Sequence, residues 1–417
     1  MGENKESETY YKDELTPPTF LNQDFFENIL RNEEKSFDLK ITKLEITPGS
    51  KAKDHFSSII FKAIVDYASQ GKVTNGRRFV VKTLPVADTV KKELLKGSSI
   101  FDREIEMYTK VLPEMKSILE SIGDDEEFAP SLIYCNRDPP ILAFEDITSR
   151  GYVMHEPLFD FDNTIKITKK LAKFHALSYY MNDDNKYNQK LNLTQYQCLM
   201  DQAMMEKFKI FFHGFQYLKE EMTKWEGFAE IAEKIGNLNE TFPDKLVQAF
   251  KFIPDFSVLC HGDFHAKNLM FIKNGENVEK TIFLDYQMCF WGSPVIDLIY
   301  VLYAIGDEVS RKRRKEIVLI YQRSLSEYLS RLGCSKKPPT LMDLNIDMLQ
   351  KGTIEILWLV CFLPFSAIDF TTLDMESLTN PTPETMAKLR RTMYSNSNVV
   401  KMLKENLPEL VFKGILH

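Results

Sequence analysis

The first part of the chain alternates short apolar runs with turn residues, a pattern typical of a small β-sheet. Runs rich in Ile, Val and Phe, bounded by Gly, Pro, Ser or Asn, predict strands at residues 39–47, 57–67 and 78–84. Two more strands are predicted at residues 132–135 and 141–145. Apolar residues at helical spacing predict helices over residues 20–35 and 101–112, and Pro113 is expected to close the second.

After residue 145 the apolar spacing becomes helical. Helices are predicted at residues 164–180, 194–214, 217–235 and 243–252, and from residue 295 onward. Two short strands are predicted near residues 269–272 and 281–285. A chain of 417 residues is too long for one ordinary core, so we expect an α+β protein with two lobes. The N-terminal lobe would span residues 1–145 and the C-terminal lobe residues 146–417.

Charge and cysteine spacing exclude several classes of protein. The net charge of −7 provides no global basic field, so we expect no nucleic-acid partner. The one basic cluster, residues 311–315, lies in a helical stretch and is predicted to be a solvated helix face. The six cysteines show neither CxxC pairs nor His partners at ligand spacing, which argues against a zinc site and a disulfide framework.

No segment predicts membrane insertion. Residues 1–15 are polar and acidic and lack the apolar core of a signal peptide. The longest apolar stretch, residues 354–368, contains Glu355 and Pro364 and is too short to span a bilayer. We therefore expect a cytoplasmic protein.

The most informative segment is residues 259–271, where a His-Gly-Asp motif ends at Asp263 and Asn268 follows five residues later. Phosphoryl transfer to an alcohol needs a carboxylate that orients the hydroxyl and accepts its proton, and hard oxygen ligands for Mg²⁺. Asp263 and Asn268, in a loop after an apolar strand, can meet both needs. Asp285 ends another apolar strand 22 residues after Asp263 and is expected to be the main metal ligand.

The His-Gly-Asp-x₄-Asn motif with its strand-end Asp resembles the aminoglycoside phosphotransferase and choline kinase group, and within it the ecdysteroid kinase-like (CHK kinase-like) family. Further segments that fit this family are residues 101–113, 144–146, 171–178, 285–287 and 292–298. The match extends from about residue 48 to residue 303. The resemblance implies a bilobal protein-kinase-like fold, with a small β-rich N-lobe and a larger, mostly helical C-lobe.

The resemblance also implies roles for single residues. Asp263 is similar to the catalytic base of the family, and Asn268 and Asp285 are similar to its magnesium ligands. Lys82 is similar to the strand lysine that contacts the phosphates of ATP. These assignments imply that ATP and Mg²⁺ are the cofactors.

Lys82 ends an apolar strand, and a lysine in such a position needs a carboxylate or a phosphate nearby. The resemblance implies that this partner is Glu104 on the inserted helix. Glu106 is the rival, since it is only two residues away, but it should project from the opposite side of the helix.

Two backbone segments are expected to hold the nucleotide. The turn at residues 48–57 would cover the phosphates with the N–H groups of Gly49 and Ser50, but it has fewer glycines than the family usually shows, and a plain hairpin turn stays open as an alternative. The resemblance also implies that the backbone of residues 144–147, which includes Glu145 and Ile147, binds adenine.

Three further residues, two histidines and an aspartate, are interpreted from their positions in the chain. His265 stands where the family often has tryptophan; it would support Asp263 or the transferred phosphate, or else brace the loop. His175 is predicted to be a core histidine with satisfied hydrogen bonds. Asp297 begins a helix and is predicted to cap it, while the resemblance suggests that it holds the backbone of the catalytic loop.

We therefore expect a kinase that transfers the γ-phosphate of ATP to a hydroxyl of a small molecule. The resemblance favours an ecdysteroid or another apolar hydroxylated metabolite or xenobiotic. The alternatives are a pseudokinase that binds ligands without turnover, and a kinase of choline-like or sugar substrates. A protein kinase is disfavoured, because no Asp-Phe-Gly or Ala-Pro-Glu motif occurs.

Aromatic residues of the C-terminal lobe suit a steroid-sized ligand, although a helical core needs them as well. They are Phe211, Phe212, Phe215, Trp225, Trp358, Phe362 and Phe365.

Overall fold

The structure is a computed structural model that describes residues 15–49, 58–84, 99–155, 158–183, 191–207, 214–251, 253–366 and 382–417. The chain forms two units: the described residues up to Met154 together with Leu269–Gln287, and the described residues of the remainder. The first is built on an antiparallel sheet and the second is mostly helical. This is the α+β organisation, a β-rich part followed by a mostly helical part, that the sequence predicts.

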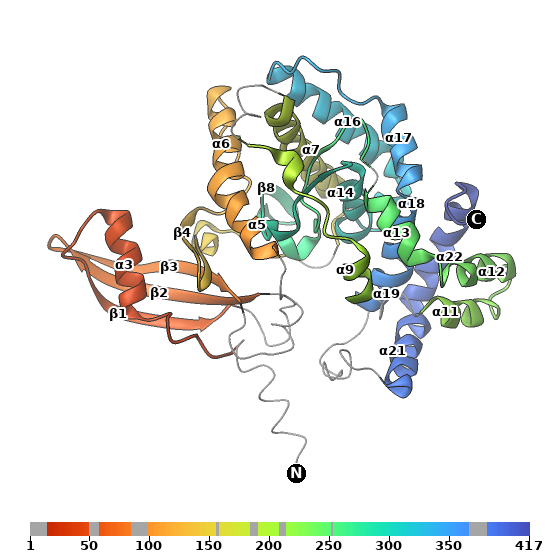
Figure 1. Ribbon diagram of the computed structural model, residues 1–417, viewed down its shortest axis with the longest axis horizontal. Helices are drawn as coiled ribbons and strands as arrows, with labels where there is room; N and C mark the ends of the chain where they lie inside the picture. Colours follow the sequence, from red (N-terminus) through yellow and green to blue (C-terminus); the bar gives the residue numbers. More distant parts are fainter. Residues whose placement is uncertain are drawn as a thin grey trace, which may run out of the picture. The chain divides into compact units, whose positions relative to one another are not determined.

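The first unit contains a five-stranded antiparallel sheet in the order β1-β2-β3-β5-β4. Its strands are β1 (Lys40–Pro48), β2 (Ile59–Ser69), β3 (Lys72–Thr83), β4 (Leu132–Arg137) and β5 (Pro140–Glu145). Side chains of β2 alternate between buried and half-buried, as expected for a strand with one covered face. Helix α3 (Gln23–Glu34) covers that face and buries Phe26 against Phe61 and Phe79 (Figure 1).

The inserted helix continues past Pro113, so the predicted end at that residue is wrong. It consists of α5 (Ile100–Glu106), a π-helical segment η1 (Met107–Val111) and α6 (Leu112–Ser121). Pro113 lies in the first turn of α6, where a backbone N–H is not required by the helix. A proline that follows a π-helical segment therefore does not stop the helix here.

A hairpin far along the chain belongs to the first unit. Its strands are β7 (Leu269–Asn274) and β8 (Asn277–Phe283). Val153 and Phe271 exchange backbone hydrogen bonds of 2.9 and 2.8 Å, after the short helix η2 (Ile147–Arg150). Buried Tyr152 packs with Met270 in the same small core. The chain thus divides near Met154 and again around this hairpin, rather than once near Glu145.

The second unit is built around the long helices α7 (Phe161–Asp183) and α16 (Arg314–Arg331). Its short two-stranded sheet pairs β6 (Val258–Cys260) with β9 (Phe290–Gly292). The other helical segments before β9 are η3 (Leu193–Gln195), α9 (Gln202–Lys207), α11 (Phe215–Met222), α12 (Ala229–Leu238), α13 (Phe242–Lys251) and η4 (Ala266–Asn268), and η5 (Tyr286–Met288) joins the two units in sequence. Those after β9 are α14 (Val295–Tyr300), η6 (Val301–Ile305), α15 (Glu308–Lys312), α17 (Leu341–Gln350), α18 (Gly352–Ile356), η7 (Leu357–Phe362), α19 (Leu363–Ser366), α21 (Pro383–Ser395) and α22 (Ser397–Phe412).

The single helix predicted at residues 217–235 is wrong. The chain forms α11 and α12 instead, with Gly227 between them at a positive φ of 79°. Glycine adopts this left-handed conformation readily, so the chain can turn there and bring the two helices side by side (Figure 1). The helix predicted at residues 194–214 is likewise interrupted, because η3 and α9 are separate elements.

The basic cluster at residues 311–315 is not wholly solvated. Arg314 forms two hydrogen bonds of 2.7 Å with Glu355, which is fully buried and also accepts a 3.0 Å bond from Tyr303. This network joins α16 to α18 and η6 inside the second unit. The prediction of a solvated face fails at Arg314, because its carboxylate partner lies far away in sequence.

No single helix in the described ranges is long and apolar enough to cross a membrane; one pair, Leu341–Gln350 with Gly352–Ser366, reaches that length and composition only with a 61° bend.

Candidate active site

The candidate catalytic loop follows β6, whose three residues are fully buried. The chain turns at Gly262, which has a positive φ of 80°. A Cβ atom at this position would lie 2.3 Å from the backbone oxygen of Met288. Both the backbone conformation and the space therefore require glycine next to Asp263.

Replacing Gly262 by Ala tests this requirement, and Gly275→Ala is a matched control. Gly275 also has a positive φ, of 61°, but nothing lies within 4 Å of an added Cβ. We expect Gly275→Ala to lower the free energy of unfolding by about 1–2 kcal/mol. Gly262→Ala should cost roughly 1–3 kcal/mol more, because a backbone oxygen must move.

Denaturant unfolding measures both changes, and turnover should fall only in Gly262→Ala. Equal losses of stability in the two variants would show that the contact with Met288 does not matter.

Asp297 holds the start of the catalytic loop. Its carboxylate accepts hydrogen bonds from the backbone N–H of His261 (2.6 Å) and of Gly262 (3.0 Å). Helix α14 has no side-chain cap, so the prediction that Asp297 caps the helix is wrong, and the alternative that it holds the loop backbone is confirmed.

A buried chain of hydrogen bonds continues behind Asp297. His175 Nε2 lies 3.1 Å from the Asp297 carboxylate and His175 Nδ1 lies 2.7 Å from the Tyr321 hydroxyl. All three side chains are fully buried. His175 is thus a core histidine with both ring nitrogens engaged, as predicted. Tyr321 was missed by sequence reasoning, because nothing marks one tyrosine of a long helix as the partner of a histidine on another.

The Asp263 side chain is 32% exposed and makes contacts within its own loop. Asn268 Nδ2 donates to Asp263 Oδ2 (3.0 Å) and to the Asp263 carbonyl oxygen (2.9 Å), and His265 Nε2 lies 3.5 Å from Asp263 Oδ2. Burial raises the pKa of Asp263, but His265, His261 and Asn268 lower it more, so its pKa lies below the usual value. Asp263 is therefore a carboxylate at neutral pH.

The Asn268 amide group is oriented by these same bonds. Both involve its nitrogen, which leaves the amide oxygen as the atom that can coordinate a cation. An uncharged oxygen of this kind is a normal ligand of Mg²⁺.

In the first unit, Lys82 near the end of β3 is held by two carboxylates. Its ammonium group lies 2.5 Å from Glu104 and 2.8 Å from Asp285, and its side chain is 5% exposed. Burial lowers the pKa of Lys82, but Asp285 and Glu104 raise it more, so the group stays positively charged. The rival Glu106 instead forms an exposed pair with Lys110 at 2.8 Å.

Asp285 has an unusual backbone conformation. Its φ is +60°, in the left-handed region that non-glycine residues rarely adopt. The carbonyl oxygen of Phe128 accepts hydrogen bonds from Phe283 N–H (2.7 Å) and from the Tyr286 hydroxyl (3.0 Å), one on each side of Asp285 in sequence. Strained residues persist where the surroundings fix them, and they are often functional. Phe128 could not be found from the sequence, because it acts through its backbone oxygen.

The carboxylate of Asp285 also fits a metal ligand chemically. Its Oδ1 contacts Lys82, and its Oδ2 accepts a 3.3 Å bond from Gln287. Carboxylate oxygens are the hard ligands that Mg²⁺ prefers. Among the described residues, no group of three or more His, Cys, Asp and Glu side chains forms a metal site. A magnesium ion would therefore depend on few protein ligands, with water or phosphate completing its shell.

The other predicted nucleotide contacts are only partly described. Gly49 donates from its N–H to the Ile60 carbonyl oxygen at 2.7 Å, and an added Cβ would clash with Ile60. Ser50 and the rest of that turn lie outside the described residues. Glu145 N–H donates to the Ser131 carbonyl oxygen (3.0 Å), and Ile147 is buried at the start of η2.

The aromatic residues predicted to suit a ligand pocket differ in burial and in the aromatic side chains that they contact. Phe215 is fully buried against Phe242, and Trp225 is half-buried beside Phe228. Trp358 is buried and contacts Tyr300 and Phe362. Phe365 is half-buried, while Phe211 and Phe212 lie outside the described residues.

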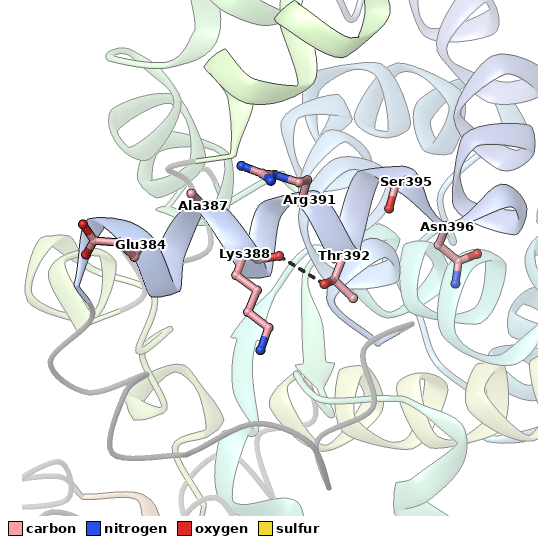
Figure 2. Close-up of a pocket in the computed structure, with 7 residues that line it drawn as sticks. All are labelled: Glu384, Ala387, Lys388, Arg391, Thr392, Ser395 and Asn396. Carbon is pink, nitrogen blue, oxygen red and sulfur yellow. Dashed lines mark hydrogen bonds between the residues drawn. The ribbon is translucent and has the colours of Figure 1, made fainter.

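One surface hollow is lined by residues 384–396, none of which was predicted to belong to the active site. Figure 2 shows that the residues lining it project from α21 and its C-terminal end, with the Thr392 hydroxyl donating to the Lys388 carbonyl oxygen at 3.1 Å. None of the predicted site residues lines it. We assign it no part in the chemistry.

A sheet-based unit with a buried Lys-Glu-Asp cluster and a helical unit with an anchored His-Gly-Asp-x₄-Asn loop are features of a kinase-like protein. The chain belongs to the ecdysteroid kinase-like family, a family of small-molecule kinases, whose model matches residues 52–334. A search of curated proteins finds no match.

The comparison with solved structures finds three proteins, among others, that align with most of this chain. Macrolide 2'-phosphotransferase MphH from Brachybacterium faecium is 12% identical with a TM-score of 0.37, and the alignment covers 89% of this chain and 98% of that one. An ethanolamine kinase from Plasmodium vivax is 12% identical with a TM-score of 0.40, over 94% and 93% of the two chains. Aminoglycoside 2'-phosphotransferase-IIIa, solved with GDP, is 13% identical with a TM-score of 0.41, over 93% and 99%.

Proposed function

We propose that this chain transfers the γ-phosphate of ATP to a hydroxyl group of a small molecule, with Mg²⁺ as cofactor. The observation that carries this proposal is the buried ammonium group of Lys82, held by Glu104 and Asp285. A cluster of buried charges lowers the stability of a protein unless the charges are well paired. Proteins often tolerate the replacement of such a cluster by apolar residues, so a cluster without a function need not be kept. Its presence in a kinase-family chain favours an active enzyme over a pseudokinase.

Each residue then has a distinct role. Asp263 accepts a hydrogen bond from the acceptor hydroxyl and takes its proton as the new O–P bond forms, while His265 supports the Asp263 carboxylate. Asn268 and Asp285 would each supply an oxygen ligand to Mg²⁺, and Lys82 would bind the phosphates of ATP. The metal ion, when bound, neutralises negative charge on those phosphates.

The nucleotide would be held mainly by backbone groups. Gly49 and Ser50 would approach the phosphates, and the backbone from Glu145 to Ile147 would bind adenine. The acceptor is an ecdysteroid or a similar apolar hydroxylated compound, which the family assignment favours. A reducing cytoplasm suits the six free cysteines of the chain.

Substitution of the metal ligands tests the cofactor assignment. We expect Asp285→Ala to lower the affinity for ATP in the presence of Mg²⁺ by at least about tenfold, because a charged ligand is removed. Asn268→Ala should lower it less, since the amide oxygen has no formal charge. Titration calorimetry with and without Mg²⁺ measures both effects.

Glu106→Ala is the control, because it removes a carboxylate from the same inserted helix that forms a surface pair with Lys110 at 2.8 Å. Negligible effects of Asp285→Ala and Asn268→Ala would contradict the metal assignment. A coupled ATP-consumption assay over ecdysteroids, choline, ethanolamine and aminoglycosides then tests the acceptor class. Turnover of choline or aminoglycosides but of no steroid would overturn the proposed acceptor.

A further inference from the structure

Tyr300 occupies a position one helical turn after Asp297 on α14. Residues three apart lie on the same face of a helix. Asp297 binds the backbone N–H groups of His261 and Gly262, which immediately precede Asp263. The face of α14 that carries Tyr300 is therefore the face turned toward the catalytic loop.

The Tyr300 hydroxyl differs from those of other buried tyrosines in the same unit. The hydroxyl of Tyr303 bonds to Glu355 (3.0 Å) and that of Tyr321 to His175 (2.7 Å). The hydroxyl of Tyr394 bonds to the Val360 carbonyl oxygen (3.1 Å). For the Tyr300 hydroxyl, no hydrogen-bond partner occurs among the described residues, although its side chain is only 8% exposed. Burial and the charges of Asp263 and Asp297 raise the pKa of Tyr300, so it remains a phenol that can donate.

Two more aromatic rings extend from Tyr300. The rings of Tyr300 and Trp358 meet edge to face with centroids 4.8 Å apart, and those of Trp358 and Phe362 with centroids 5.1 Å apart. The indole Nε1 of Trp358 is buried and has no hydrogen-bond partner among the described residues. A buried polar atom without a partner is unusual in a core and points to a missing ligand or water.

The backbone that carries these rings is irregular. Trp358 and Phe362 belong to the π-helical segment η7, and the π-helical segment η6 begins directly after Tyr300. Such segments are rare and are frequent at functional sites. Their wider turns displace side chains from the positions that a regular α-helix would give them.

We propose that Tyr300, Trp358 and Phe362 form the acceptor-binding wall of this kinase, and that the Tyr300 hydroxyl donates a hydrogen bond to the acceptor oxygen that faces Asp263. The wall binds the apolar ring body of an uncharged acceptor, because all three of its side chains are aromatic and carry no charge. This inference rests on the proposed function, since it assigns the acceptor side of the same reaction.

The first test uses turnover. We expect Tyr300→Phe to lower kcat for a hydroxylated ecdysteroid by about tenfold with little change in KM, because the ring is kept and one hydrogen bond is lost. Trp358→Leu should raise KM by about tenfold or more, because it removes ring contact area. ATP affinity, measured by calorimetry, should stay unchanged in both variants.

Tyr67→Phe is the matched control, since it also removes the hydroxyl of a buried tyrosine, which bonds to Glu34 at 2.7 Å, but lies on β2 and outside the segments of the proposed wall. Its kcat/KM should equal that of the wild type. An unchanged kcat/KM in Tyr300→Phe, or an equal loss in Tyr67→Phe, would overturn the role of Tyr300.

The second test is independent of turnover. The chain has three tryptophans, so a Trp225→Phe, Trp291→Phe double variant reports fluorescence from Trp358 alone. Addition of the ecdysteroid without ATP should change this fluorescence, and choline should not. A fluorescence change without any turnover would support ligand binding at the wall but contradict the proposed kinase activity. Turnover without a fluorescence change, or a change with choline only, would reject the wall.

Discussion

Replacing Asp263 by Asn is expected to lower kcat by about 10²–10⁴-fold, because the amide cannot accept the proton of the acceptor hydroxyl. Asn has nearly the same shape as Asp, so the hydrogen bond from Asn268 to Oδ can be kept. Fold and ATP affinity should therefore remain normal. Steady-state kinetics with the best acceptor, together with calorimetry for ATP, measure the two properties separately.

The pH profile gives a second measurement on the same residue. Because its pKa lies below the usual value, Asp263 should remain ionised as pH falls through the neutral range. Loss of kcat through protonation of Asp263 is expected only at pH values below the ordinary pKa of an aspartate. Near-normal kcat in Asp263→Asn, or an acidic limb near neutrality that disappears in this variant, would contradict the assignment.

The second large effect concerns stability rather than chemistry. Glu355→Ala leaves the guanidinium of Arg314, whose side chain is 18% exposed, without its carboxylate partner. Breaking a buried pair in this way typically costs about 3–5 kcal/mol. The double variant Arg314→Met, Glu355→Leu should recover much of this loss, because neither charge remains. The midpoints of denaturant unfolding measure both changes, provided that the slope of unfolding free energy against denaturant concentration is the same in all variants.

The neighbouring pair Arg313–Glu316 provides a control. Both side chains are about half exposed, at 44% and 51%, so Glu316→Ala should change stability only slightly. Burial raises the pKa of Glu355, but its bonds with Arg314 lower it more, so its folded pKa lies below the unfolded value. The stabilisation is thus present above the unfolded pKa and is lost as pH falls through the folded one. Equal losses in the Glu355 and Glu316 variants would refute the importance of burial.

The sequence predicted the sheet and the long helix over residues 164–180 because these depend on local patterns. Strand runs, a lysine after apolar residues and the His-Gly-Asp-x₄-Asn spacing are all visible within short segments. The pairing of Lys82 with Glu104 was implied by the family resemblance, and helical geometry argued only against Glu106 as the partner.

Features that depend on distant partners could not be predicted in this way. Arg314 looks like part of an exposed basic run until Glu355 is brought beside it. Pro113 resembles a helix end, and only the preceding π-helical segment explains why the helix continues. The carbonyl oxygen of Phe128 has no sequence signature at all.

That carbonyl oxygen has a thermodynamic consequence for ligand binding. It ties down Phe283 and Tyr286 on both flanks of Asp285, so the turn is ordered when the chain folds. The conformational entropy of this carboxylate is therefore lost when the chain folds. Binding of a cation or nucleotide then loses less entropy. Preorganisation of this kind places the Asp285 carboxylate before a ligand arrives, so this turn does not have to become ordered on binding.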